Sequence, residues 1–310
     1  MTKLLLLKEQ IVVLYAKHEV FITPIVKVIL AFITIMMINN QLGYYALASN
    51  LTIVSVVALA CSFLPYSFIL YAATGFCLLH FYAMGMELLL LGGCGFALIY
   101  ILFMQFITKE SLVVVLLPIL FLWKVPYMIP VAMGLIGTPF SIISVGCGIF
   151  VYYMIYHMQE NMALLSTLGA DALIQKVRII IDALLDDRGM MVLFVSFTLT
   201  VLVVYTIRRL QIEYAWTVAM LSGYVLNIVV LLVGDLKFDT NISLFVIVLG
   251  SLGSLVVTKI MEFFLFNMDY SRTETTQFED DEYYYYVKAV PKIAISTSKK
   301  TVKKMNTTKK

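Results

Sequence analysis

Charged side chains are scarce in this chain. They make up 13% of its 310 residues, while 62% of the residues are hydrophobic; an ordinary soluble domain has about 25% charged and about 45–50% apolar residues. Water could not solvate a surface with so few polar groups, which excludes a soluble globular protein. Apolar runs of about 20 residues, the length that crosses a bilayer as a helix, follow one another with short gaps. The sequence therefore predicts an integral membrane protein with many crossings.

Motifs that would indicate an enzyme or a cofactor site are absent. The chain has no phosphate-binding G-x-x-x-x-G-K-[ST], no zinc-binding H-E-x-x-H and no nucleophile motif G-x-S-x-G. Its four cysteines lie in apolar runs without C-x-x-C spacing, so they indicate neither a disulfide framework nor a zinc site. His157 and Glu160 have the helical spacing of two metal ligands, which is too few for a site. We predict no catalytic residue, no cofactor and no metal.

The apolar runs predict an all-α fold, a polytopic transmembrane helix bundle with about eight spans plus a re-entrant or broken hairpin. Nine or ten spans are the alternatives. Residues 1–23 are predicted to form an interfacial amphipathic helix, because their charged residues fall largely on one helical face. Pro24 is then expected to begin the first membrane bundle, residues 24–157. The spans of this bundle are predicted at about 24–38, 45–63, 66–83, 87–107 and 139–157.

Residues 111–137 do not have the pattern of one span. Pro118, Pro126 and Pro130 interrupt the run, and Lys124 sits near its midpoint. Each arm, about 13 residues long, would reach about 20 Å as a helix, short of the roughly 30 Å of a hydrocarbon core. We expect a broken hairpin that enters and leaves on one side, and its irregular backbone must be buried in protein or line a wet cavity. Lys124 is an unusual charge if the tip lies at membrane depth and an ordinary one if the tip reaches the interface.

A polar segment, residues 158–189, separates two membrane bundles. It is predicted to hold an amphipathic helix that begins after Asp171 as its N-cap and stops at Gly189. The second bundle covers residues 190–266, with spans at about 190–207, 214–233 and 242–265.

The basic residues divide unevenly between the two sides that this topology defines. If the hairpin adds no net crossing, the basic residues at 3–27, 109, 208 and 209 and those of the C-terminal tail fall on one side, and Lys176, Arg178, Arg188 and Lys237 fall on the other. Loops rich in Lys and Arg stay in the cytoplasm. Both termini are therefore predicted to be cytoplasmic, and residues 158–189 external, in a cell (plasma) membrane.

Polar residues inside or beside the apolar runs are the candidate functional residues. They are His80, Glu87, Gln105, Lys124, Asn227, Lys259 and Glu262. His80 and Glu87 flank a break between two runs and could form a protonatable pair, while Glu87 and Gln105 share one helical face. Lys259 and Glu262, three residues apart, either pair with each other or extend to the membrane surface.

Small residues mark two further lines along predicted spans. The first recurs every four residues and consists of Ala215, Ala219, Gly223 and Asn227. It is either a helix-packing seam or a seam that ends in a substrate-binding amide. The second consists of Gly250, Gly253 and Ser254 and indicates a similar seam.

Residues 267–310 are predicted to form a cytoplasmic tail. Acidic residues stand directly before four tyrosines and a lysine-rich end, and the candidate partner-binding residues are Glu279, Asp280, Asp281, Glu282, Tyr283, Tyr284, Tyr285 and Tyr286. The Tyr-Val run has strand propensity. The tail is either a solvated segment with a short docked strand or a segment that binds a partner, by strand addition or by attraction of its lysines to anionic lipid.

Several segments resemble a group of uncharacterised polytopic membrane proteins from Gram-positive gut bacteria. They are DYSRTE at 269–274, QFEDDEYYYYVKAVPK from residue 277, RRLQIEYAWT at 208–217 and KVPYMIPVAMGLIGTP at 124–139. The likeness covers most of the chain. It implies a bacterial plasma membrane and adds no catalytic residue, since no activity is assigned to the group.

A transport-type permease, or the membrane subunit of one acting with a partner, is the function that these features favour. A broken hairpin and inward polar residues are what a translocation path needs. The alternative is a non-transporting scaffold or assembly factor for cell-envelope processes, and an intramembrane enzyme is third. The partners expected are the lipid bilayer and a protein that binds the tail, and no nucleic acid. Substrate, energy coupling and oligomeric state are left open.

Overall fold

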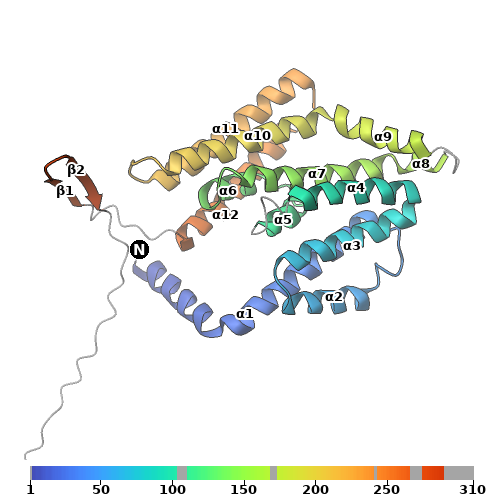
Figure 1. Cartoon of the computed structure of the whole chain (residues 1–310), viewed down its shortest axis with the longest axis horizontal. Helices are drawn as coiled ribbons and strands as arrows, with labels where there is room; N and C mark the ends of the chain where they lie inside the picture. Colours follow the sequence, from blue (N-terminus) through green and yellow to red (C-terminus); the bar gives the residue numbers. More distant parts are fainter. Residues whose placement is uncertain (1, 103–109, 168–172, 241–242, 266–273, 290–310) are drawn as a thin grey trace, which may run out of the picture. The chain divides into compact units, whose positions relative to one another are not determined.

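The computed structural model describes residues 2–102, 110–167, 173–240, 243–265 and 274–289. Residue contacts divide the chain into two compact units, whose helices and strands are labelled in Figure 1. Unit 1 contains residues 1–18 and 263–310, and unit 2 contains residues 19–262. Most of both predicted membrane bundles falls in unit 2.

The described structure is built of helices and one pair of strands. The helices are α1 (Thr2–Leu42), α2 (Leu51–Phe63), α3 (Ser67–Met84), α4 (Met86–Leu102), α5 (Ser111–Leu122), α6 (Met128–Ile136), α7 (Ser141–Glu160), α8 (Met162–Thr167), α9 (Leu173–Asp186), α10 (Arg188–Arg208), α11 (Ala215–Phe238) and α12 (Leu244–Leu265). Among the described residues, six helices are long and apolar enough to cross a bilayer, namely α1, α3, α7, α10, α11 and α12, and α2, α4 and α5 are shorter apolar helices. The chain is a multi-pass membrane protein with an all-α fold. The predicted count of eight crossings is reached only if α2 and α4 also cross.

Large apolar side chains cover the outside of these helices. Phe63, Val225 and Leu236 are 89%, 62% and 84% exposed. Exposure to water would forfeit about 1.5–3 kcal/mol for each large apolar side chain, so this surface belongs in lipid or against protein. Inside, buried hydrophobic residues form two main clusters, one mainly among α1, α3, α4, α5 and α7 and the other mainly among α5, α6, α7, α10 and α11.

Helix α1 is interrupted at His18 and not at Pro24. The backbone of His18 (φ −117°, ψ 18°) leaves the helical region, and the boundary between the two units falls directly after it. The helix continues through Pro24, so this proline does not begin a helix, and the start of the first span at residue 24 stays a prediction. Pro24 removes one backbone hydrogen bond, a loss that membrane helices tolerate.

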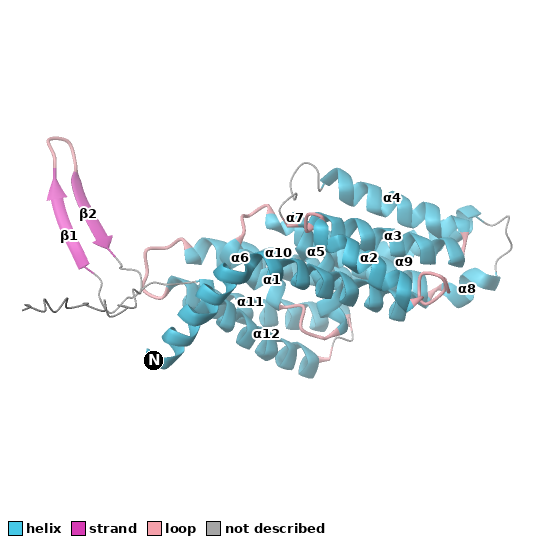
Figure 2. Ribbon diagram, turned by 90° about the horizontal axis from the view of Figure 1, so that it is seen from below, coloured by secondary structure: helices cyan, strands magenta, loops and turns pink. Residues whose placement is uncertain are grey.

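Contacts between helix termini define two ends of unit 2. At one, called end A, Glu110 precedes α5 and accepts hydrogen bonds from the first turn of α7, and Arg208 closes α10 and binds backbone carbonyls at the close of α6. At the other, called end B, α3 ends against α1, and α7 ends against the start of α10 through His157 and Asp187. Helices α3, α7, α10 and α11 run side by side between these ends (Figure 2). Charged side chains therefore gather at two levels, with apolar packing between them.

Two short helices stand where the sequence predicts a broken hairpin. Helix α5 has 12 residues and α6 has 9. Their outer termini both lie at end A, so the chain enters and leaves unit 2 at the same end. The turn between them is level with Gly250, where a Cβ would come within 2.5 Å of the Lys124 carbonyl oxygen. Because Gly250 is the seventh residue of α12, the turn lies about 9 Å along that helix from its first residue.

Helix α5 ends in a Schellman motif. The N–H of Val125 donates to the carbonyl of Leu120, and the N–H of Lys124 donates to the carbonyl of Phe121, both at 3.0 Å. The residue in the left-handed conformation is Lys124, with φ 60°. Glycine is usual there, because a side chain costs about 1–2 kcal/mol in this conformation. The two bonds satisfy carbonyls that the end of α5 would otherwise leave unpaired inside the unit.

Glycines allow α11 to approach α10 closely. A Cβ on Gly223 would lie 2.4 Å from Cγ2 of Val204, and a Cβ on Gly234 would lie 2.3 Å from Cγ1 of Val192. Ala219, on the same face of α11, is fully buried. The packing seam predicted along this helix is present.

The segment between α7 and α10 contains α8 and α9. Asp171, the predicted N-cap, lies outside the described residues. Helix α9 packs against α4 and α7. Gly189 does not end α9, because Asp187 accepts a hydrogen bond from the N–H of Met190 (2.8 Å) and caps α10, which places Gly189 in the first turn of α10. The prediction of a glycine stop is wrong.

Unit 1 joins the first residues of α1 to the close of α12 and carries the tail. The ammonium of Lys8 donates to the carbonyl of Phe263 and lies 5.1 Å from the centre of its ring. In the tail, β1 (Glu274–Glu279) and β2 (Tyr284–Ala289) form an antiparallel hairpin in which Phe278 is opposite Tyr285. The predicted strand thus pairs within the tail.

We predict that Gly223→Ala lowers the free energy of unfolding by about 1–3 kcal/mol, because the new methyl group would overlap the buried, branched Val204. Gly75→Ala is the matched control. Its Cβ would meet nothing within 4 Å, and alanine is the better helix former, so this change should be neutral or stabilising. Thermal unfolding of both variants in the same detergent measures the difference. Equal melting temperatures would contradict the close approach of α10 and α11.

Candidate functional site

His80 belongs to a buried hydrogen-bonded network at end B. The N–H of Tyr45 donates to its Nδ1 (3.1 Å), which places the ring hydrogen on Nε2, and Nε2 donates to Oδ1 of Asn39 (2.8 Å). Asn39 in turn donates to the carbonyl of Ala48 (2.8 Å). The side chain of His80 is fully buried. Because both ring nitrogens bond to neutral groups, His80 holds the segment between α1 and α2 in place.

Glu87 forms an ion pair with Lys176 of α9 and not with His80. The two atoms Oε1 and Nζ are 3.1 Å apart, and the side chains are only 12% and 14% exposed. Gly85 (φ 152°) reverses the chain between α3 and α4 and places Glu87 in the first turn of α4, where it meets α9. The predicted protonatable pair is therefore wrong. Gln105, predicted to share a face with Glu87, lies outside the described residues.

His157 lies between two carboxylates at end B. Its Nε2 is 2.8 Å from Oδ2 of Asp187, and its Nδ1 is 3.4 Å from Oε2 of Glu160. Burial acts to raise the pKa of Asp187, but hydrogen bonds from His157 and from the N–H of Met190 outweigh it and hold that pKa below its ordinary value of 3.8. The ionised Asp187 thus both caps α10 and binds His157. Among the residues that the structure describes, no group of three or more His, Cys, Asp or Glu side chains is placed to hold a metal ion.

End A holds polar contacts around Glu110 and Arg208 that the sequence pattern does not reveal. Glu110 accepts hydrogen bonds from the hydroxyls of Ser141, at 2.7 Å, and Ser144. Arg208 donates to the carbonyls of Leu135 and, at 2.8 Å, Gly137. The partners are 31 to 73 residues apart in the chain, so no local spacing could have identified them. Together they fasten the start of α7 and the close of α6.

The ion pair predicted between Lys259 and Glu262 is present. Nζ and Oε2 are 2.6 Å apart, and Oε1 of Glu262 also accepts a hydrogen bond from Thr217 of α11 (2.7 Å). Glu262 is 8% exposed, whereas the side chain of Lys259 is 52% exposed. The lysine therefore pairs with the glutamate and extends outward as well, which unites the two alternatives read from the sequence.

A hydroxyl group of α12 contacts the turn of the α5–α6 hairpin. Ser254 of α12 donates to the carbonyl of Val125 (3.3 Å). One turn further along α12, Thr258 donates to the carbonyl of Ser254 and shares a hydrogen bond with the hydroxyl of Tyr224 of α11. All three side chains from α11 and α12 are buried. The second predicted seam, at Gly250 to Ser254, is thus a contact with the hairpin turn.

Two polar groups near the middle of unit 2 are left unpaired. Oδ1 of Asn227 accepts a hydrogen bond from Ser196 (3.1 Å), but its Nδ2 has no hydrogen-bond partner among the described residues, and neither has Oγ of Ser251. Asn227 is 0% and Ser251 2% exposed. Each unpaired buried group costs about 1–3 kcal/mol, so a polar group from outside the chain would be stabilised there. The role of Asn227 in binding a substrate stays a prediction.

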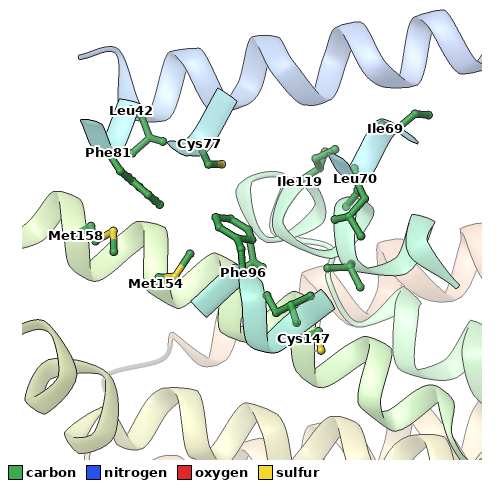
Figure 3. Packing of buried hydrophobic residues seen from close by; sticks show 14 of the residues in the cluster. Leu42, Ile69, Leu70, Cys77, Phe81, Phe96, Ile119, Cys147, Met154 and Met158 are labelled. Atoms are coloured by element: carbon green, nitrogen blue, oxygen red, sulfur yellow. The ribbon is translucent and has the colours of Figure 1, made fainter. Parts of the chain in front are cut away.

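A narrow cavity of about 80 Å³ lies in unit 2 between α1, α3, α4, α5 and α7. Leu70, Cys77, Phe96 and Ile119 are among its lining residues, and Figure 3 shows these side chains between α1 at the top and α7 below it. Lys124 does not line it. The side chain of Lys124 is exposed at the hairpin turn.

The tail presents an aromatic surface. Tyr284 and Tyr286, on one face of β2, are 69% and 78% exposed, while Tyr285, on the other face, stacks on Phe278 with ring centres 5.0 Å apart. The other candidate residues of the tail are exposed in the loop and at its edges, namely Glu279, Asp280, Asp281, Glu282 and Tyr283.

Asp280 fixes the loop of the tail hairpin. Its carboxylate accepts hydrogen bonds from the N–H groups of Glu282 and Tyr283 and from the hydroxyl of Tyr285. These bonds hold the pKa of Asp280 below its ordinary value. The bond between the Tyr285 hydroxyl and this carboxylate also raises the pKa of Tyr285. The arrangement gives the exposed tyrosines a defined position.

We predict that Asp187→Ala lowers the free energy of unfolding at pH 7 by about 0.5–2 kcal/mol, the usual worth of a helix N-cap. Because the pKa of Asp187 is depressed in the folded state, its stabilisation is complete above the ordinary value of 3.8 and is lost as pH falls through the lower folded value. The stability of the wild type should drop in this acid range and that of the variant should drop less. Asp186→Ala, at an exposed neighbouring acid, is the control; equal losses in both variants would contradict the role of the cap.

Comparison of the chain with protein-family models, with curated proteins and with solved structures finds no match. The resemblance to membrane proteins of Gram-positive gut bacteria stays a prediction. Function must be inferred from the hairpin turn, the buried polar groups around it and the tail.

Proposed function

We propose that this chain is a permease-type membrane subunit in which the α5–α6 hairpin forms part of the path for a solute. The observation that carries the proposal is that the hairpin turns inside unit 2, level with Gly250 of α12. Interrupted helices at membrane depth occur where the backbone is buried in protein or lines a wet cavity, and transporters use such helices to bind their substrates.

The buried polar groups beside the turn support this proposal. Ser254 reaches the turn directly, and the unpaired groups of Asn227 and Ser251 lie on the helices that pack around it. A bundle held together by packing alone would gain stability from apolar residues at these positions, because an unpaired polar group in an apolar interior is unfavourable. A passing solute with hydrogen-bonding groups would pair with them.

The charge of the two ends supports an orientation. End A carries Lys259 and Arg208, and the tail with its lysines follows α12; end B carries Lys176 and Arg188. The lysines near the N-terminus and in the tail outnumber the basic residues between α7 and α10, so the positive-inside rule supports cytoplasmic termini in a plasma membrane.

The path is tested by the reactivity of two single cysteines at the same depth. In a variant without native cysteines, Lys124→Cys places a thiol at the hairpin turn, and Leu252→Cys places one on the 56% exposed apolar face of α12, two residues beyond Gly250. We expect a water-soluble maleimide to modify residue 124 and to leave residue 252 unmodified, since a thiolate forms in water and not in lipid. Modification of both residues would show that the turn lies outside the hydrocarbon. Modification of neither would show that water does not reach the turn. Either result overturns the proposal.

The second candidate, a non-transporting scaffold for cell-envelope processes, is favoured by the tail. A two-stranded hairpin alone is marginally stable in water, and this one exposes Tyr284 and Tyr286 on one face. Exposed tyrosines are common anchors of protein interfaces. A protein partner at the tail is compatible with both candidates, and its identity separates them.

We predict that Tyr284→Ala combined with Tyr286→Ala removes a protein that crosslinks to the tail in cells, because both rings leave the exposed face. Tyr285→Phe is the control, since it keeps the ring that stacks on Phe278 and removes only the hydroxyl. Mass spectrometry of the crosslinked protein identifies the class: an ATPase or a solute-binding protein supports the permease, and an envelope-synthesis or division protein supports the scaffold. An unchanged set of crosslinked proteins in the double variant would exclude this face as the partner site.

A further inference from the structure

The cavity between α1, α3, α4, α5 and α7 has an apolar depth and a polar mouth. Leu70 and Val114 lie at the level nearest end A, and Phe96 and Ile119 line the wall with Cys77. Gln41 and Gln159, the second-last residues of α1 and α7, lie at the opposite limit, at end B. No Lys, Arg, Asp, Glu or His is among the lining residues. The lining therefore changes from hydrocarbon to amide along the axis of the bundle.

The two threonine hydroxyls in the lining of the cavity are already used. Thr34 donates to the carbonyl of Leu30 in its own helix (2.7 Å), and Thr74 accepts a hydrogen bond from the hydroxyl of Tyr100 (2.7 Å). A hydrophilic solute in the depth would find few free partners, and burying it there would be unfavourable. This excludes a sugar, an amino acid or an inorganic ion as the occupant.

The shape of the cavity restricts the occupant further. Its lining extends along α7 from Val151 to Gln159, eight residues or about 12 Å of helix, while its volume is about 80 Å³. A space of this length and volume fits part of a single hydrocarbon chain. Filling such a void restores dispersion contacts that its lining atoms otherwise lack.

We propose that this cavity binds one acyl chain of a bilayer lipid, with the polar headgroup of the lipid at Gln41 and Gln159. The cavity lining is apolar at one end and polar at the other, as a lipid is, and this match favours an amphiphile. Lipid would be the source, because the same helices expose apolar side chains such as Ile29 and Met36 of α1 (52% and 37% exposed). The site goes beyond the permease proposal and does not depend on it.

The test uses the full-length protein in lipid nanodiscs that contain a phosphatidylcholine with a photoreactive diazirine on one acyl chain. After illumination, mass spectrometry maps the modified residues. We expect adducts on the lining segments of α3 and α5, around Cys77 and Ile119. Ala73→Phe fills the cavity from α3, where Ala73 lines it with 8% exposure, and should abolish these adducts. Ala60→Phe, the same change at an exposed position of α2, should keep them.

Adducts confined to outward side chains such as Leu59 and Phe63 in the wild type would overturn the proposal, as would unchanged labelling of the lining in Ala73→Phe. If Ala73→Phe aggregates, Ala73→Leu provides a smaller filling residue, and the wild-type map decides alone if neither variant can be purified. The outcome is separate from the reactivity of Lys124→Cys. Labelled lining with an unreactive residue 124 would leave the lipid site standing and remove the path.

Discussion

The rest of the structure depends on one requirement, which is that the backbone of the α5–α6 turn must be hydrogen bonded although it lies inside an apolar bundle. Three devices meet it: the Schellman bonds of Lys124 and Val125, the hydroxyl of Ser254, and the close approach that Gly250 permits. Each is specific to this location. A side chain at residue 250 would separate α12 from the turn, and the carbonyl of Val125 would then lose its bond from Ser254. An unpaired group in hydrocarbon costs several kcal/mol.

This requirement also explains why charges concentrate at the two ends. The hairpin returns to end A, so the residues that hold its outer termini must lie there, and Glu110 and Arg208 bind the two flanking helix termini. End B, which the hairpin does not reach, instead fastens the long helices to one another through His157 and Asp187. The bundle is consequently held at both ends by polar bonds, while the level of the turn is held by packing and hydroxyl groups. The part of unit 2 with the fewest strong bonds is the part where a path would need to open.

Features that depend on residues close together in the chain could be predicted from their spacing. The four-residue recurrence that ends at Asn227 gave the seam between α10 and α11, three-residue spacing gave the Lys259–Glu262 pair, and short arms between prolines gave the two helices of the hairpin. Partners far apart in the chain could not be predicted. His80 binds a residue 41 positions earlier and Glu87 one 89 positions later, and both choices follow from the packing of whole helices.

Residue 124 is a lysine at a position of the helix end where glycine is usual. Three non-glycine residues of the described chain have positive φ, namely Lys124, Tyr214 and Asp239. The other two lie at the termini of α11, whereas Lys124 closes a helix inside the bundle, where glycine would satisfy the same Schellman geometry without the cost of a side chain. A turn shaped by stability alone would therefore carry glycine. The side chain of Lys124 is exposed at the turn, so the residue adds a positive charge that the geometry of the helix end does not require. A charge at membrane depth is a mark of a functional site more often than of packing.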